Sequence, residues 1–122
     1  MNISEEKQKA MYDLVATFLV AVNQKDRESL LSKFEVTSMM FDEILASLEY
    51  LGHRDLSLIA YEKTRNHHVI NRPIFEIDEI EHDTFIVECI IQNFRKDTEL
   101  ILQGYVDCED QNLKYYAPLF KS

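Results

Sequence analysis

IFEIDEIEHDTFIVECIIQNFRKDTELILQGYVDCEDQNLKYYAPLF, residues 74–120, is the stretch that decides the fold. Apolar and polar residues alternate through four runs, at 74–80, 84–94, 98–108 and 113–120, and short polar turns separate the runs. A period of two is typical of strands that bury one face. The stretch therefore predicts a four-stranded antiparallel meander.

Turn length and hydrophobic pattern predict the register of this meander, because a slip of one residue would move every side chain to the opposite face. The middle hairpin closes over Arg95 and Lys96, the last closes over 109–112, and the first turns at 81–83. All three turns place the same apolar side chains on one face, which we expect to be the core. These side chains are Phe75, Ile77, Phe85, Val87, Cys89, Ile91, Leu100, Leu102, Val106, Leu113, Tyr115, Ala117 and Leu119.

The opposite face of the predicted sheet mixes apolar and acidic side chains. Glu76 falls opposite Glu88, and like charges at facing positions destabilise a sheet by up to ~1 kcal/mol. A cationic partner would remove that penalty, whereas the alternative is a solvated acidic face that tolerates a few isoleucines. The expected members of this face are Ile74, Ile86, Ile90, Ile101, Tyr105, Tyr116 and Phe120, with Glu76, Asp78, Glu88, Glu99 and Asp107 between them.

The first half of the chain predicts three helices and one more strand. Side chains that can cap a helix stand before each apolar stripe, at Ser4, at Asp26 and at Thr37 or Ser38. Gly52 stands where a left-handed C-cap is expected. We expect helices at about 4–23, 26–35 and 38–51, and strands at about 56–62, 74–80, 84–94, 98–108 and 113–120. The predicted fold is α+β, a single domain over residues 1–122, with three N-terminal helices packed on a curved antiparallel sheet of four to five strands.

The composition limits which partners the chain can bind. Its 122 residues hold 13 Lys and Arg against 22 Asp and Glu, a formal net charge of -9. Such a chain repels phosphate backbones and anionic membranes, so we expect no direct binding to nucleic acid or membrane, and a basic protein is the natural partner. Neither a signal peptide nor a bilayer-spanning run is recognisable, which predicts a cytoplasmic protein. Cys89 and Cys108 lie too far apart in the predicted register for a disulfide.

The core face offers little for acid–base catalysis or metal binding. Tyr115 supplies the only titratable oxygen among its central positions, whereas a general acid or base must lie beside the substrate. We therefore expect no catalytic residue, no cofactor and no enzyme activity. A cation held by Glu76, Asp78 and Glu88 is also not expected, because hard cations take about six or more oxygen ligands.

Two short runs near the N-terminus carry a resemblance to a known superfamily. FLVAVNQKD at 18–26 is followed by LLSKF at 30–34, and both precede the curved meander. This order resembles the nuclear transport factor two-like superfamily, whose members often start with a helix reading FLxAlnxgDxexLl. The resemblance covers most of the chain and implies a cone-shaped α+β fold. Members include isomerases, dehydratases, polyketide cyclases, adaptors and immunity proteins of bacterial toxin systems.

Among these members, the acidic chain looks most like the small immunity proteins of bacterial polymorphic toxin and contact-dependent growth inhibition systems. The resemblance implies an immunity protein that binds and neutralises a basic toxin domain, with a nuclease as the expected toxin. An acidic surface can occlude the basic surface with which a nuclease holds phosphates. The expected partner-binding residues are the carboxylates of Glu76, Asp78, Glu88 and Asp107, with Ile86, Ile90 and Tyr105 as apolar anchors.

Two other interpretations stay open. A small-ligand-binding protein or enzyme of the same superfamily requires a pocket between helices and sheet, with Tyr115 beside a second polar group. A homodimeric adaptor would pair the outer faces of two chains. The acidic centres of these faces would repel one another unless Lys114 and Lys121 reach across the interface. We expect a monomer or a weak homodimer.

Overall fold

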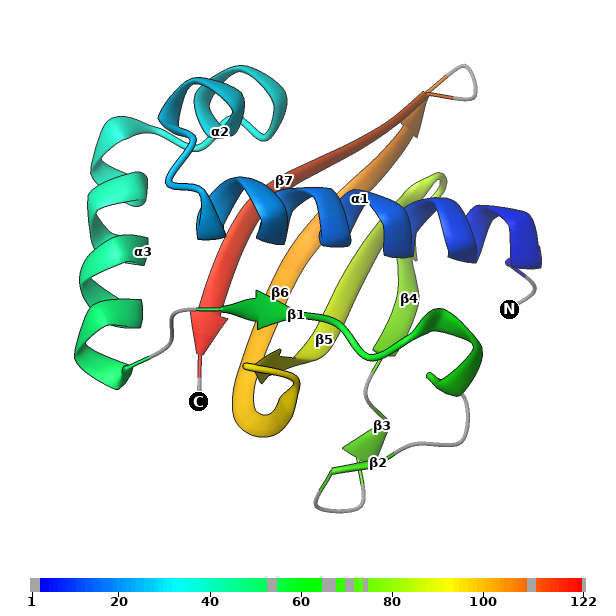
Figure 1. Cartoon of the computed structure of the whole chain (residues 1–122). Helices are drawn as coiled ribbons and strands as arrows, with labels where there is room; N and C mark the ends of the chain where they lie inside the picture. Colours follow the sequence, from blue (N-terminus) through cyan, green and yellow to red (C-terminus); the bar gives the residue numbers. More distant parts are fainter. Residues whose placement is uncertain are drawn as a thin grey trace.

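Three helices lie against one curled antiparallel sheet, which has the shape of a half-barrel (Figure 1). Helix α1 (Glu5–Asn23) lies across the strands, and α2 (Arg27–Lys33) and α3 (Ser38–Leu51) follow at one end of the sheet. The predicted α+β class, with three N-terminal helices on an antiparallel sheet, is confirmed. This is a computed structural model, which describes residues 3–52, 55–64, 68–69, 72–73, 75–109 and 112–121.

All three helices begin at predicted caps. The side chains of Ser4, Asp26 and Thr37 each accept a hydrogen bond from the backbone N–H three residues further on. Gly52 ends α3 with a φ of 75°, a left-handed conformation that costs glycine little. Burying the stripe of α1 contributes on the order of 10 kcal/mol before chain entropy is subtracted. Its most buried members are Met11, Val15, Phe18, Leu19 and Val22.

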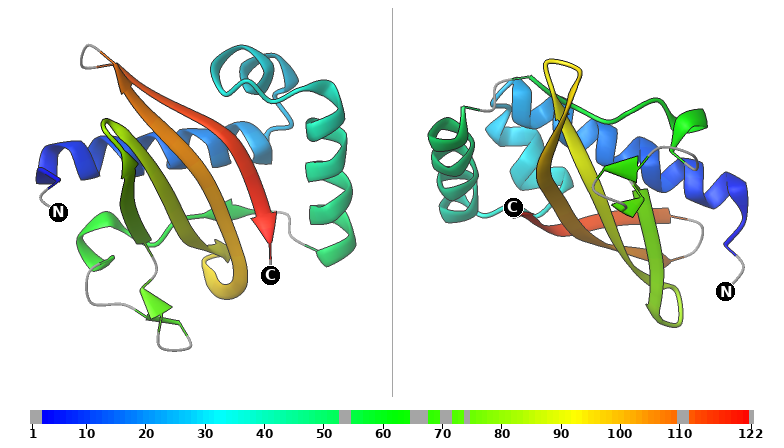
Figure 2. Two further views of the ribbon diagram at one scale, coloured as in Figure 1. Left: turned by 180° about the vertical axis from the view of Figure 1, so that it is seen from behind. Right: turned by 90° about the horizontal axis from the view of Figure 1, so that it is seen from below.

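Five strands form the main sheet, and two short strands form a separate hairpin. β5 (Thr84–Asn93) and β6 (Lys96–Glu109) lie in the middle, and β7 (Asn112–Lys121) flanks β6. The other side of β5 is shared by β1 and β4 (Figure 2). The remaining strands are β1 (Leu56–Ser57), β4 (Phe75–Glu81), and β2 (His68–Val69) with β3 (Arg72–Pro73) in the small hairpin.

The segment after β1 leaves the sheet, so the predicted strand at 56–62 is wrong beyond Ser57. Tyr61–Lys63 form one 3-10 turn instead. The Tyr12 hydroxyl donates a hydrogen bond to the Ile59 carbonyl, and the rings of Tyr12 and Tyr61 pack edge to face at 5.2 Å. These contacts with α1 hold the segment after β1 against the helix, so its backbone does not pair with a neighbouring strand.

Most of the predicted register is confirmed. Glu76 faces Glu88 across the first hairpin, and Cys89 faces Leu102 across the second. Cys89 and Cys108 both carry free thiols. Differences occur at all three hairpins, where local backbone geometry outweighs the apolar pattern. In the first hairpin Glu81 still pairs with Thr84, so the turn is one residue shorter than the predicted 81–83, and the register shifts between Glu79 and Glu81.

The middle turn falls one residue earlier than predicted. Phe94 and Arg95 form it, with φ values of 52° and 62°, so the prediction that Arg95 and Lys96 close the hairpin is wrong. A bulge in β6 then restores the predicted pairing. The Thr98 hydroxyl stabilises this bulge by donating a hydrogen bond of 2.6 Å to the Ile91 carbonyl.

The end of β7 is displaced by one residue, so the predicted placements there are wrong. Gly104 faces both Ala117 and Pro118, in a bulge where Ala117 has a φ of 52°. Pro118 has no N–H to donate to the ladder, which favours a slip at this point. Beyond it Leu119 turns outward and is 54% exposed, whereas Phe120 turns inward and its ring stacks against α1.

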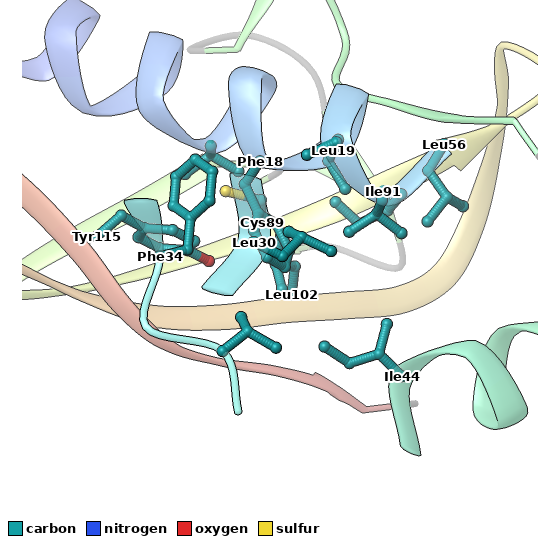
Figure 3. Close-up of a cluster of buried hydrophobic side chains, with 14 of the residues drawn as sticks. Phe18, Leu19, Leu30, Phe34, Ile44, Leu56, Cys89, Ile91, Leu102 and Tyr115 are labelled. Carbon is teal, nitrogen blue, oxygen red and sulfur yellow. The ribbon is translucent and has the colours of Figure 1, made fainter. Parts of the chain in front are cut away.

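The bulge lies beside the most crowded point of the core, where the Tyr115 ring crosses Gly104. This ring is 1% exposed, and its centroid lies 5.6 Å from that of Phe18 and 6.2 Å from that of Phe34 (Figure 3). A Cβ atom on Gly104 would overlap the Tyr115 ring. Space for this ring, in addition to curvature of the sheet, therefore requires the glycine.

Gly104→Ala is expected to lower the free energy of unfolding by about 3 kcal/mol, because the added methyl group overpacks the core against Tyr115. Urea denaturation followed by circular dichroism measures the loss. Gly52→Ala is the control. Nothing lies within 4 Å of the Cβ atom that this substitution adds, so only the positive φ lowers the free energy of unfolding, by about 1 kcal/mol. Equal losses in the two variants would contradict the steric role of Tyr115.

Candidate partner-binding surface

One face of the sheet is covered by the helices, and none of the described helices covers the other. Figure 2 shows this second face from behind, with α1 crossing on the far side of the strands. Side chains from four adjacent strands, β4 to β7, meet on it. We call this surface the outer face, and its residues are Glu76, Asp78, Ile86, Glu88, Gln103, Tyr105, Asp107, Tyr116 and Leu119.

A row of four side chains crosses the middle of the outer face: Asp78, Ile86, Tyr105 and Tyr116 occupy facing positions on the four strands. The rings of Tyr105 and Tyr116 stack, with centroids 5.7 Å apart. The Tyr116 hydroxyl donates a hydrogen bond of 3.1 Å to Asp107, and partial burial together with this bond raises the pKa of Tyr116. The row therefore presents a fixed aromatic pair beside carboxylates.

Glu76 and Glu88 lie opposite one another in the next row. The ammonium of Lys121 lies 3.4 Å from the Glu88 carboxylate and donates a hydrogen bond of 2.7 Å to the Gln103 side chain. This ion pair is partly exposed, so it offsets only part of the repulsion between the glutamates. Within the described part of the chain, no hydrogen bond or ion pair engages the side chains of Glu76 and Asp78.

Lys114 is the second lysine beside the outer face. It faces Asp107 across the ladder, but its ammonium pairs with Glu35 at 2.6 Å, and the hydrogen bond to Glu35 raises the pKa of Lys114. Lys114 and Lys121 are thus both engaged within the chain. The outer face keeps an excess of negative charge that these two lysines do not cancel.

Six of the predicted partner-binding residues lie together on the outer face, and the seventh lies beneath its margin. Ile90 is 5% exposed and packs with Ile59 and Ile101. The segment after β1 covers it, so Ile90 supports the surface from below and does not present its side chain to a partner. The six that share the outer face are Glu76, Asp78, Ile86, Glu88, Tyr105 and Asp107.

Sequence reasoning missed two candidate contact residues. Tyr116 was expected on the outer face but not among the partner-binding residues, although the predicted register already sets it opposite Tyr105, where two rings can stack. Leu119 was expected in the core, and the signal that could have moved it outward is Pro118, which marks the bulge. Ile74, also expected on this face, lies outside the described residues.

The pocket that the small-ligand interpretation requires would hold Tyr115. The Tyr115 hydroxyl is buried without a hydrogen-bond partner among the described residues, and burial raises its pKa well above the usual value. One hollow of about 380 Å³ lies between α1, α3 and β1, and another of about 160 Å³ lies between α3 and β7. Tyr115 lines neither of these hollows.

Three groups that could bind a metal ion come together at the turn between β4 and β5. Ligand atoms of Glu79, His82 and Asp83 all lie within 4.8 Å of one another. The Asp83 N–H donates to the Glu79 carboxylate at 3.3 Å, and His82 Nε2 lies 3.2 Å from the Asp83 carboxylate. These contacts stabilise the turn by themselves, and His82 is almost fully exposed. We assign the three side chains to the turn.

Comparisons with known proteins give no relative: no family model, no curated protein and no solved structure matches the chain. None of the described helices is long and apolar enough to cross a membrane. The geometry and charge of this chain are therefore the basis for assigning it a function.

Glu76→Gln is expected to raise the free energy of unfolding by about 0.5 kcal/mol, because it removes one of two facing charges. The gain, measured by chemical denaturation, should shrink when salt is added, since salt screens exposed charges. Glu99→Gln removes one exposed charge from the same sheet and is the matched control, with a smaller effect. A less stable Glu76→Gln protein would contradict the repulsion.

Proposed function

We propose that this chain is a bacterial immunity protein that binds and neutralises a basic toxin domain in the cytoplasm. One observation carries the proposal: the outer face, which none of the described helices covers, holds a stacked tyrosine pair among carboxylates, of which Glu76 and Asp78 have no partner in the described part of the chain. Such a face, on a chain of net charge -9, fits a basic protein surface. A nuclease domain is the expected toxin, because nucleases hold phosphates with basic residues.

Neutralisation would work by occlusion. The carboxylates attract the basic surface of the toxin over a long range and speed association, which matters when the toxin acts quickly. Tyr105 and Tyr116 then provide the apolar contact at the centre, where residues that dominate binding energy usually lie. A lysine or arginine of the toxin between Glu76 and Glu88 would also relieve their repulsion, so the complex gains an interaction that the free protein lacks.

The order of helices and meander supports placing the chain in the nuclear transport factor two-like superfamily, as part of the same proposal. Its enzymes use a polar group that faces a pocket, whereas the Tyr115 hydroxyl lies in an aromatic cluster at 1% exposure. A binding protein is therefore favoured over an enzyme. The superfamily's immunity proteins combine this fold with the acidic character that the chain has.

The test is capture of the toxin by the tagged chain from its native cells, at low and then high salt, followed by mass spectrometry. Glu76→Lys with Glu88→Lys is expected to weaken binding of the captured basic domain by about two orders of magnitude. The free energy of unfolding should fall by at most about 1 kcal/mol, because two facing lysines repel about as strongly as two facing glutamates, whereas Glu88→Lys replaces the partly exposed ion pair with Lys121 by a repulsion. Loss of binding at high salt is expected for the same electrostatic reason.

The matched control is Glu28→Lys with Glu49→Lys, which changes the net charge equally on exposed positions of α2 and α3. This pair is expected to slow association slightly and to leave the dissociation rate unchanged. Capture of no basic domain would refute the proposed function. Equal losses in the two double variants would show that net charge, and not the outer face, decides binding.

A further inference from the structure

The turn between β5 and β6 is built from residues that do not favour its backbone conformation. Phe94 and Arg95 occupy both central positions, at φ values of 52° and 62°. Turns of this kind are most favourable with Asn followed by Gly, because other side chains crowd the backbone at positive φ. Phe94 recovers only part of that cost through packing, since it is 57% exposed. Stability alone therefore does not account for these residues.

The same turn is basic on an acidic chain. Arg95 and Lys96 are exposed, and neither side chain has a hydrogen bond or ion pair with another residue that the structure describes. We call Phe94, Arg95 and Lys96 the hairpin tip. It presents one aromatic ring, one guanidinium and one ammonium group. Aromatic residues and arginine are enriched at protein interfaces, and arginine is frequent among the contacts that dominate binding energy.

The backbone of the hairpin tip is held in place by the segment before β1. The Phe94 N–H donates a hydrogen bond of 2.9 Å to the Asp55 carbonyl. The Asn93 side chain accepts a hydrogen bond of 3.0 Å from the Asp55 N–H and donates one of 3.4 Å to the Gly52 carbonyl. A turn fixed in this way loses little conformational entropy when it binds, so it can act as a preorganised anchor.

The hairpin tip joins β5 and β6, the two strands that carry the centre of the outer face (Figure 1). Ile59 covers Ile90 between the outer face and the tip, so a partner that lies along these strands and over this segment reaches the tip as well. We infer that the hairpin tip is a second contact with the toxin domain, and that Phe94 enters an apolar pocket whose rim carries carboxylates that pair with Arg95 and Lys96. This inference rests on the proposed function. In a metal-dependent nuclease, the catalytic site is such a place, because carboxylates hold its metal ion there.

The test compares three variants for binding to the toxin domain captured by the wild-type chain. Phe94→Asn with Arg95→Gly creates the favoured Asn-Gly turn, so the melting temperature should rise by roughly 5 °C. Affinity for the toxin domain should nevertheless fall by at least about 30-fold. Arg95→Glu should weaken binding more than Arg95→Gly does, because it places a negative charge against the carboxylates of the pocket.

Lys25→Gly is the matched control, since it also removes one exposed positive charge at a positive φ, of 54°, between α1 and α2. It should raise stability and leave affinity unchanged. Unchanged affinity of the tip variants, with binding still lost in the Glu76 and Glu88 variant, would overturn this inference alone. Equal effects of Arg95→Glu and Arg95→Gly would overturn the carboxylate-rimmed pocket. Capture of no basic domain would overturn both the inference and the proposed function.

Discussion

The packing of the Tyr115 ring across Gly104 is the contact on which the rest of the sheet depends. Because Gly104 lacks a side chain, the ring can lie inside the core and pack against Phe18 and Phe34. β7 bulges at the adjacent Ala117, and this bulge exchanges the faces of the residues that follow. Tyr115 fills the helix-facing side of β6 and β7. The opposite side of these strands carries no such packing, and it forms part of the outer face.

The sequence predicted the helices and long strands well, because apolar residues recur at regular intervals along them. The apolar spacing of three and four residues located the helices, and alternation located the long strands, because both patterns average over many side chains. The middle turn and the end of β7 escaped prediction for the opposite reason. The middle turn depends on the Thr98 hydroxyl, which bonds to the Ile91 carbonyl, and the end of β7 depends on the missing N–H of Pro118. A single group of this kind produces no repeating pattern in the sequence, so periodicity does not predict its effect.

The residues of the candidate site were likewise predicted correctly where they follow a repeating pattern and incorrectly where they do not. Alternation along β4, β5 and β6 was sufficient to place Glu76, Asp78 and Tyr105 on one surface. The burial of Ile90 could not be predicted, because Ile59, which covers it, comes from a segment that the sequence assigned to a strand. Tertiary placement of a non-repetitive segment therefore decided which of the predicted anchors faces solvent.

Two local conflicts of this chain lie on its exposed side. Glu76 and Glu88 repel one another across β4 and β5, and Phe94 and Arg95 hold positive φ values at the turn that ends β5. Each conflict lowers the stability of the free protein, yet each presents groups that a partner of opposite charge could satisfy. Natural sequences keep such inconsistencies where binding requires them. Both conflicts involve β5, which supports the proposal that a partner would lie along this strand.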